Sequence, residues 1–76
     1  MKTIAIYQNP QICAGLRFAG AETHHITTEE ELIIVLESLQ TTDNLVILDP
    51  TLAELEASKK FIEENPNSLI TKGPKL

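Results

Sequence analysis

The apolar run Leu45–Leu48 (LVIL) places the strongest constraint on how this chain folds. It lies between the polar segment 41–44 and Asp49-Pro50, so turn residues border it on both sides. A short unbroken apolar run with such borders is typical of a strand that is covered on both faces of its sheet. Strands of this kind belong to parallel sheets with helices on both sides. The run therefore predicts an α/β fold.

Three further segments predict strands. Thr3–Tyr7 is a short β-prone apolar run that ends at the turn signal Asn9-Pro10. Segment 22–26 is a second, weaker strand with poor alternation, and segment 68–71 is a last short strand. Together with the apolar run, these segments predict four strands.

Three segments between the strands predict helices. Segment 11–19 places an apolar residue at i, i+4 and i+7, and Gly20 stands where a glycine ends a helix. Segment 29–40 begins with a Thr28/Glu31 capping-box pattern and three glutamates that suit the positive end of the helix dipole. Its apolar stripe is Leu32, Val35, Leu36 and Leu39.

The third helix is predicted to begin after Asp49, an N-cap, with Pro50 as its first residue. Leu52, Leu55 and Ile62 are expected on its inner face. It should end before Pro66, because the residue that precedes a proline avoids the helical conformation.

The predicted order is β-α-β-α-β-α-β over a single domain, residues 1–76. Right-handed crossovers then predict a small doubly wound, flavodoxin- or Rossmann-like parallel sheet of four strands, in the order 2-1-3-4, with three helices. A sheet this narrow has two edge strands, where a partner can dock. A chain of this size with no internal disulfide favours a partner or self-association.

The charge balance narrows the classes of partner. Eleven acidic against six basic residues give a net charge of −5, which disfavours nonspecific binding to nucleic acid or to an anionic membrane. The longest apolar run, 32–36, is far shorter than the ~20 residues of a membrane-spanning helix. The first nine residues are too short and too soon polar for a signal peptide. With a single cysteine, a reduced cytoplasmic setting fits best.

Ligands of open parallel sheets bind beyond the carboxyl ends of the strands. The loop 8–11 after the first strand has no glycine, lysine or carboxylate, and neither a dinucleotide-binding nor a P-loop motif is present. Asp49 is interpreted as an N-cap rather than a phospho-acceptor or metal ligand. The adjacent His24 and His25 point to opposite faces of a strand and have no acidic neighbour that the sequence places beside them. No metal and no cofactor are expected.

Cys13 carries the alternative, enzymatic interpretation. It follows Asn9-Pro10 near a helix N-terminus, where a thiolate is favoured, and the segment faintly resembles the start of the thioredoxin-fold arsenate reductases. It stands one residue too late for that pattern, and the glycine-rich phosphate loop of the phosphocysteine sugar-transport IIB domains is missing. A buried structural thiol is therefore the preferred interpretation. A small thiol enzyme or phosphocarrier stays open as an alternative, as does a free-standing regulator that dimerises through an edge strand.

Segment 15–21 (GLRFAGA), followed by segment 27–32 (TTEEEL), resembles the F-type stalk subunits of the rotary V-type and A-type ATPases (ATP synthases). The acidic capped helix, the apolar strand 44–48 and the last strand 68–71 also match that family in order and spacing. The resemblance covers nearly the whole chain, and segment 15–21 is its most specific part.

The resemblance implies a doubly wound fold and a non-catalytic role in the central rotor stalk. Members of that family dock on the D-type coiled-coil shaft, near the C- or d-type adaptor that joins the shaft to the membrane ring. ATP synthesis or hydrolysis takes place in other subunits and is coupled to proton or sodium transport. The chain would then be cytoplasmic and peripheral to the membrane through the complex.

Four residues of segment 15–21 carry the site prediction. Arg17 and Phe18 are the candidate partner interface, since arginine and aromatic side chains are favoured anchors. Arg17 equally suits the negative end of the first helix, and Phe18 is expected to pack in the core. Gly15 and Gly20 are expected to serve close packing and helix termination. The loop 8–11 departs from the family's Gly-Asp type loop, and the regulatory role of the family's C-terminal extension is not carried over.

Overall fold

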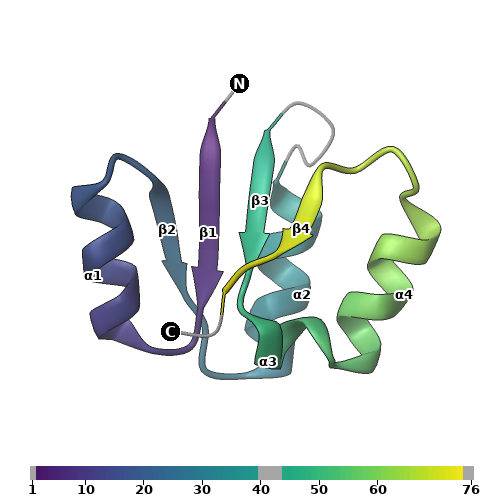
Figure 1. Cartoon of the computed structure of the whole chain (residues 1–76). Coiled ribbons are helices and arrows are strands. Elements are labelled where there is room, and N and C mark those ends of the chain that lie inside the picture. The colour runs from purple at the N-terminus through teal and green to yellow at the C-terminus, as the bar shows by residue number, and fades with distance from the viewer. Residues whose placement is uncertain (1, 40–43, 75–76) are drawn as a thin grey trace.

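A computed structural model describes residues 2–39 and 44–74 and contains a four-stranded, all-parallel sheet in the order β2-β1-β3-β4 (Figure 1). The strands are β1 (Thr3–Tyr7), β2 (Glu22–His25), β3 (Leu45–Leu48) and β4 (Ile70–Lys72). The helices are α1 (Pro10–Phe18), α2 (Glu29–Ser38), α3 (Pro50–Ala53) and α4 (Glu56–Glu64). The predicted fold class and strand order are confirmed.

β1 is an inner strand, paired on one side with β2 and on the other with β3. Its side chains alternate between two cores because successive residues of a strand point to opposite faces. Ile4 and Ile6 lie in the larger core, while Ala5 and Tyr7 lie in the smaller one. All four side chains are buried, so β1 is covered on both faces. In β3, for which such cover is predicted, Val46 and Leu48 are buried in the larger core, whereas Leu45 and Ile47 are half-buried.

The helices are divided unequally between the two faces of the sheet. α1 covers one face, where Cys13 is buried against Ala5 and Tyr7. α2, α3 and α4 cover the other face and build most of the apolar interior. The buried members of that larger core are Ile4, Ile6, Ile26, Leu32, Leu36, Val46, Leu48 and Leu52.

Side chains cap the N-termini of α1 and α2, although the sequence predicts only the cap of α2 and marks Asn9-Pro10 as a turn. The Asn9 Oδ1 accepts a hydrogen bond from the Gln11 N–H at 2.9 Å, and the Thr28 Oγ1 accepts one from the Glu31 N–H at 3.2 Å. The Glu31 carboxylate accepts from the hydroxyl of Thr27 at 2.7 Å, so the capping box is only half formed. α2 ends at Ser38, earlier than the predicted Gln40, which lies outside the described residues.

The third helix is a correction to the sequence prediction, because it is divided into α3 and α4. A continuous helix would bond the Leu52 carbonyl to the amide four residues on. Instead this carbonyl accepts from the Leu55 N–H at 3.1 Å and from the buried Ser58 hydroxyl at 2.7 Å. The turn brings Phe61 against the core and leaves Ile62, expected on the inner face, 39% exposed.

The last strand is also displaced, since β4 spans Ile70–Lys72 rather than 68–71. β2 ends one residue before the predicted Ile26, although the side chain of Ile26 still lies in the larger core. Both differences are at strand ends, where pairing with a neighbour rather than local composition decides the boundary.

Two glycines of α1 and the turn after it have different roles. Gly20 has a φ of +98°, a left-handed conformation that disfavours side chains, and it follows the C-cap residue Ala19. A Cβ at Gly15 would meet no atom within 4 Å. Helix termination by Gly20 is therefore confirmed, whereas the expectation that Gly15 serves close packing inside this chain is wrong.

Alanine at these two glycines should change stability in opposite directions. Gly20→Ala should lower the free energy of unfolding by about 1 kcal/mol, because of its positive φ. Gly15→Ala should raise it by about 0.5–1 kcal/mol, because alanine favours an exposed helix interior and nothing obstructs the methyl group. Urea denaturation of the isolated chain measures both values. Destabilisation by Gly15→Ala would show that its surroundings are tighter than described.

Candidate functional site

The outward face of α1 is a continuous surface without charge. Gln11, Ala14, Gly15 and Phe18 are all exposed and lie at i, i+3, i+4 and i+7 along the helix. These four residues are called the α1 stripe below. Uncharged side chains of this kind are uncommon on the solvent side of a helix in a chain that is otherwise rich in surface charge.

Phe18 dominates the α1 stripe, with 94% of its surface exposed. The prediction that it packs in the core is therefore wrong. Cys13 faces the sheet, and a residue five positions later is rotated by about 140° around the helix axis. The position of Cys13 therefore turns Phe18 towards solvent. An aromatic side chain this exposed is a candidate contact for a partner.

Arg17 lies beside Phe18 in the last turn of α1, where a cation suits the helix dipole. Its Nε and Nη2 both donate to the Thr23 Oγ1, each at 3.2 Å. This contact ties the end of α1 to the edge strand β2. Arg17 therefore has a structural role, and it keeps an exposed guanidinium at the border of the α1 stripe.

Cys13 is buried in the first turns of α1, with 3% of its surface exposed. Its Sγ donates to the backbone carbonyls of Tyr7 at 3.7 Å and His24 at 3.8 Å. The thiol therefore bridges α1 to β1 and β2. The expected burial of Cys13 is confirmed.

Asp49 links the loops at the carboxyl ends of β1 and β3, the place where ligands bind in doubly wound folds. Its Oδ1 accepts from the Thr51 N–H at 2.9 Å, which confirms the predicted N-cap. Its Oδ2 accepts from the Gln8 N–H at 3.1 Å. A hollow of about 200 Å³ lies between these loops. Because both carboxylate oxygens accept backbone hydrogen bonds, the structure favours an organising role for Asp49 here.

The segment after β4 crosses the carboxyl end of the sheet on the α1 side (Figure 1). The Gly73 N–H donates to the Leu48 carbonyl at 2.8 Å, and the Tyr7 hydroxyl donates to the Pro74 carbonyl at 3.1 Å. Gly73 is buried, and a Cβ there would overlap the Tyr7 hydroxyl and Ile47. Burial, and secondarily the charge of Asp49, raises the pKa of Tyr7 above its ordinary value. Sequence patterns alone do not predict these contacts for the end of the chain.

His24 has an acidic neighbour that the sequence analysis missed. Its Nε2 lies 3.2 Å from the Glu22 Oε2, and the Lys2 Nζ lies 3.9 Å from the Glu22 Oε1. The spacing of two along a strand, which puts both side chains on one face, could have revealed this pair. His25 is exposed and points to the other face, as expected for adjacent strand residues.

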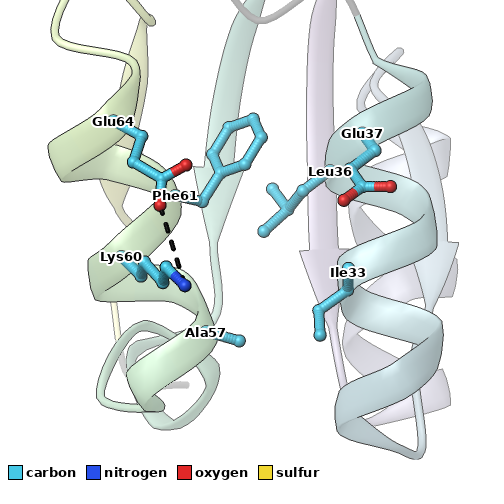
Figure 2. Close-up of a pocket in the computed structure, with 7 residues that line it drawn as sticks. All are labelled: Ile33, Leu36, Glu37, Ala57, Lys60, Phe61 and Glu64. Atoms are coloured by element: carbon cyan, nitrogen blue, oxygen red, sulfur yellow. Dashed lines mark ion pairs between the residues drawn. The ribbon is translucent and has the colours of Figure 1, made fainter.

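A groove between α2 and α4 is a second candidate site that sequence reasoning missed (Figure 2). It has a volume of about 240 Å³. Its lining comes from both helices and consists of Ile33, Leu36, Glu37, Ala57, Lys60, Phe61 and Glu64. The hydrophobic pattern of either helix alone does not show that their side chains meet in this way.

Within the described residues, no group of three or more His, Cys, Asp and Glu side chains is placed to hold a metal ion. The same part of the chain has no helix with the length and apolarity needed to cross a membrane. Comparison with models of known protein families, with curated proteins and with solved structures finds no match.

The buried phenol of Tyr7 should make stability fall at alkaline pH. Below the ordinary pKa of 10.0, the folded and unfolded chains both keep the proton. Above it, the unfolded chain loses the proton first, so the free energy of unfolding declines as pH rises through the raised folded pKa. Tyr7→Phe should remove this part of the decline, which urea denaturation at several pH values measures. Parallel curves for both proteins would contradict the assignment.

The buried thiol of Cys13 should resist modification in the folded chain. Reaction with a chromogenic disulfide reagent should be slower by roughly 100-fold or more in the native state than in denaturant, because local opening must come first. Cys13→Ser should abolish the signal and serves as the control. Equal rates in the native and unfolded states would show that the thiol is accessible.

Proposed function

We propose that this chain is a non-catalytic, protein-binding subunit that docks on a helical coiled coil through the α1 stripe. The proposal gives it the role that the sequence resemblance implies, as an F-type subunit in the central stalk of a V/A-type rotary ATPase. Its partners would be the D-type shaft protein and the C- or d-type ring adaptor. It would then contribute to the coupling of ATP turnover to ion transport, at the membrane but outside it.

The observation that carries this proposal is the exposure of Phe18. Burying a phenylalanine side chain against a partner contributes about 1.5–3 kcal/mol, which makes it an effective anchor. Its neighbours in the α1 stripe are uncharged, so a partner can cover them without removing a charge from water. Arg17 stands at the border, where an exposed cation can meet an acidic side chain of the coiled coil.

Gly15 gives independent support. A glycine inside a helix costs about 0.5–1 kcal/mol relative to alanine, and no atom of the described chain requires the missing side chain. A partner helix packed against α1 would require it, because small residues at a contact let two helices approach closely. The position of Gly15 between Ala14 and Phe18 on the same face fits a helical partner.

The two alternatives have less support. A thiol enzyme or phosphocarrier would need an accessible Cys13, whereas its Sγ is buried against backbone carbonyls. A dimer through an edge strand would use β2 or β4, and β4 offers only three residues. Neither alternative accounts for the exposed aromatic side chain on α1.

Phe18→Ser should separate docking from folding. We expect co-expression with a D-type coiled-coil protein of the same source to give a one-to-one complex on size-exclusion chromatography. The substitution should weaken binding about 10- to 100-fold, because it removes the central anchor. It should leave the melting temperature of the isolated chain nearly unchanged, because Phe18 contacts little of its own chain.

Ile34→Ser is the matched control, since Ile34 is an exposed apolar residue on α2, away from the α1 stripe. It should leave binding to the D-type protein unchanged. Separate elution of the unsubstituted chain and the D-type protein well above micromolar concentration would contradict the proposal. Equal losses for both substitutions would assign the binding to general hydrophobicity.

A further inference from the structure

The groove between α2 and α4 has apolar walls. Figure 2 shows Phe61 of α4 and Leu36 of α2 pointing toward one another across it, with Ile33 and Ala57 on the facing helix surfaces nearby. Leu36 is buried and Phe61 is half-buried, so the groove opens directly above the larger core. Ile33 keeps 38% of its surface exposed at the opening.

The rims of the groove are acidic. Glu37 stands on the α2 side and, within the described residues, makes no ion pair. On the α4 side, the Lys60 Nζ lies 3.9 Å from the Glu64 Oε1, so that lysine is next to an acidic residue of its own helix (Figure 2). A cation brought to this groove would therefore meet a carboxylate on either rim.

The surface of α2 and α4 around the groove is also negatively charged. α2 and α4 carry seven of the eleven acidic residues of the chain and two of its six basic ones. Their balance is −5, equal to the net charge of the whole chain, so the remaining residues sum to zero. The negative potential of this protein is thus concentrated on one side of its sheet, the side that α2 and α4 cover.

We propose that the groove binds an amphipathic helix of a partner protein, with apolar side chains at i, i+3 or i+4 and lysine or arginine beside them. The apolar side chains would enter between Ile33, Ala57 and Phe61, and the cations would lie along the rims at Glu37 and Glu64. This is the helix-in-groove mode of recognition. The acidic surface favours a cationic partner through both encounter rate and specificity.

The same features disfavour other occupants. A second copy of this chain would bring another surface of charge −5 against the first. A groove of about 240 Å³ that is open to solvent is smaller than the ~300–1,000 Å³ of pockets that enclose small ligands. The groove lies on the opposite side of the sheet from the α1 stripe, so it is independent of the function proposed above.

A synthetic peptide of about 18 residues, long enough to hold a helix, tests this proposal. It carries leucine at i, i+4 and i+7 and lysine at the flanking positions. A control peptide has glutamate in place of every lysine. Each peptide is titrated into the ¹⁵N-labelled full chain. The lysine peptide should shift the amide signals of Ile33, Ala57 and Phe61, and the glutamate peptide should not. Binding should weaken as salt is added, because exposed charges are screened.

Two matched pairs of substitutions locate the site. Ile33→Ser should weaken peptide binding about tenfold, whereas Ile34→Ser should change it less than about twofold, because only Ile33 lines the groove. Glu37→Lys should weaken binding more than Glu63→Lys, which changes the net charge equally but lies outside the lining. Circular dichroism and melting temperature confirm that each variant is folded.

Equal effects within either pair would overturn the proposal, as would shifts confined to α1 or equal binding of the glutamate peptide. Self-association of the chain, with the same amide shifts and no peptide present, would assign the groove to a second copy instead. The four variants do not alter the α1 stripe, since Phe18 is unchanged in all of them. Failure here and failure of the D-type complex are therefore separate results.

Discussion

Every layer of this structure is attached to β1. Its backbone forms hydrogen bonds with β2 and β3, and its side chains contribute to both cores, so packing on each face of the sheet depends on it. The two cores differ in size, because three helices cover one face and α1 alone covers the other. The groups that hold α1 include the buried thiol of Cys13, half-buried Ile12 and Leu16, and the contact of Arg17 with β2. A helix with an exposed aromatic residue is well suited to gain stability from a partner that covers it.

The sequence predicts the sheet better than it predicts the surfaces. The Leu45–Leu48 and Thr3–Tyr7 runs form the two inner strands, as their apolar composition predicts, and crossover handedness then leaves few strand orders. The break between α3 and α4 depends on the Ser58 hydroxyl reaching the Leu52 carbonyl, a contact that no periodicity signals. The exposure of Phe18 escapes sequence reasoning for a related reason, since its direction follows from where Cys13 is anchored. The groove needs the relative placement of two helices, which neither helix encodes alone.

The two candidate surfaces have different chemistry and therefore suit different partners. The α1 stripe is uncharged and contains a glycine, so it suits a partner that approaches closely and excludes water. The α2–α4 groove combines apolar walls with acidic rims, so it suits a cationic helix. Because the sheet separates these surfaces, occupation of one leaves the other open. A chain of this size can therefore join two helical segments with little backbone of its own between them.

The bond from the Tyr7 hydroxyl to the Pro74 carbonyl joins residues that are 67 positions apart. It completes the surroundings of β1 with the last described residue, and the pairing of β4 with β3 leads directly into the bond of the Gly73 N–H to the Leu48 carbonyl. A chain emerging from the ribosome in order would therefore hold β1 without one of its contacts until residue 74 had been made. Closure over such a span is slow compared with local helix formation. The sheet is therefore complete only once residues 70–74 have been made, and a partner that engages α1 earlier in synthesis would meet it before Tyr7 has gained its contact with Pro74.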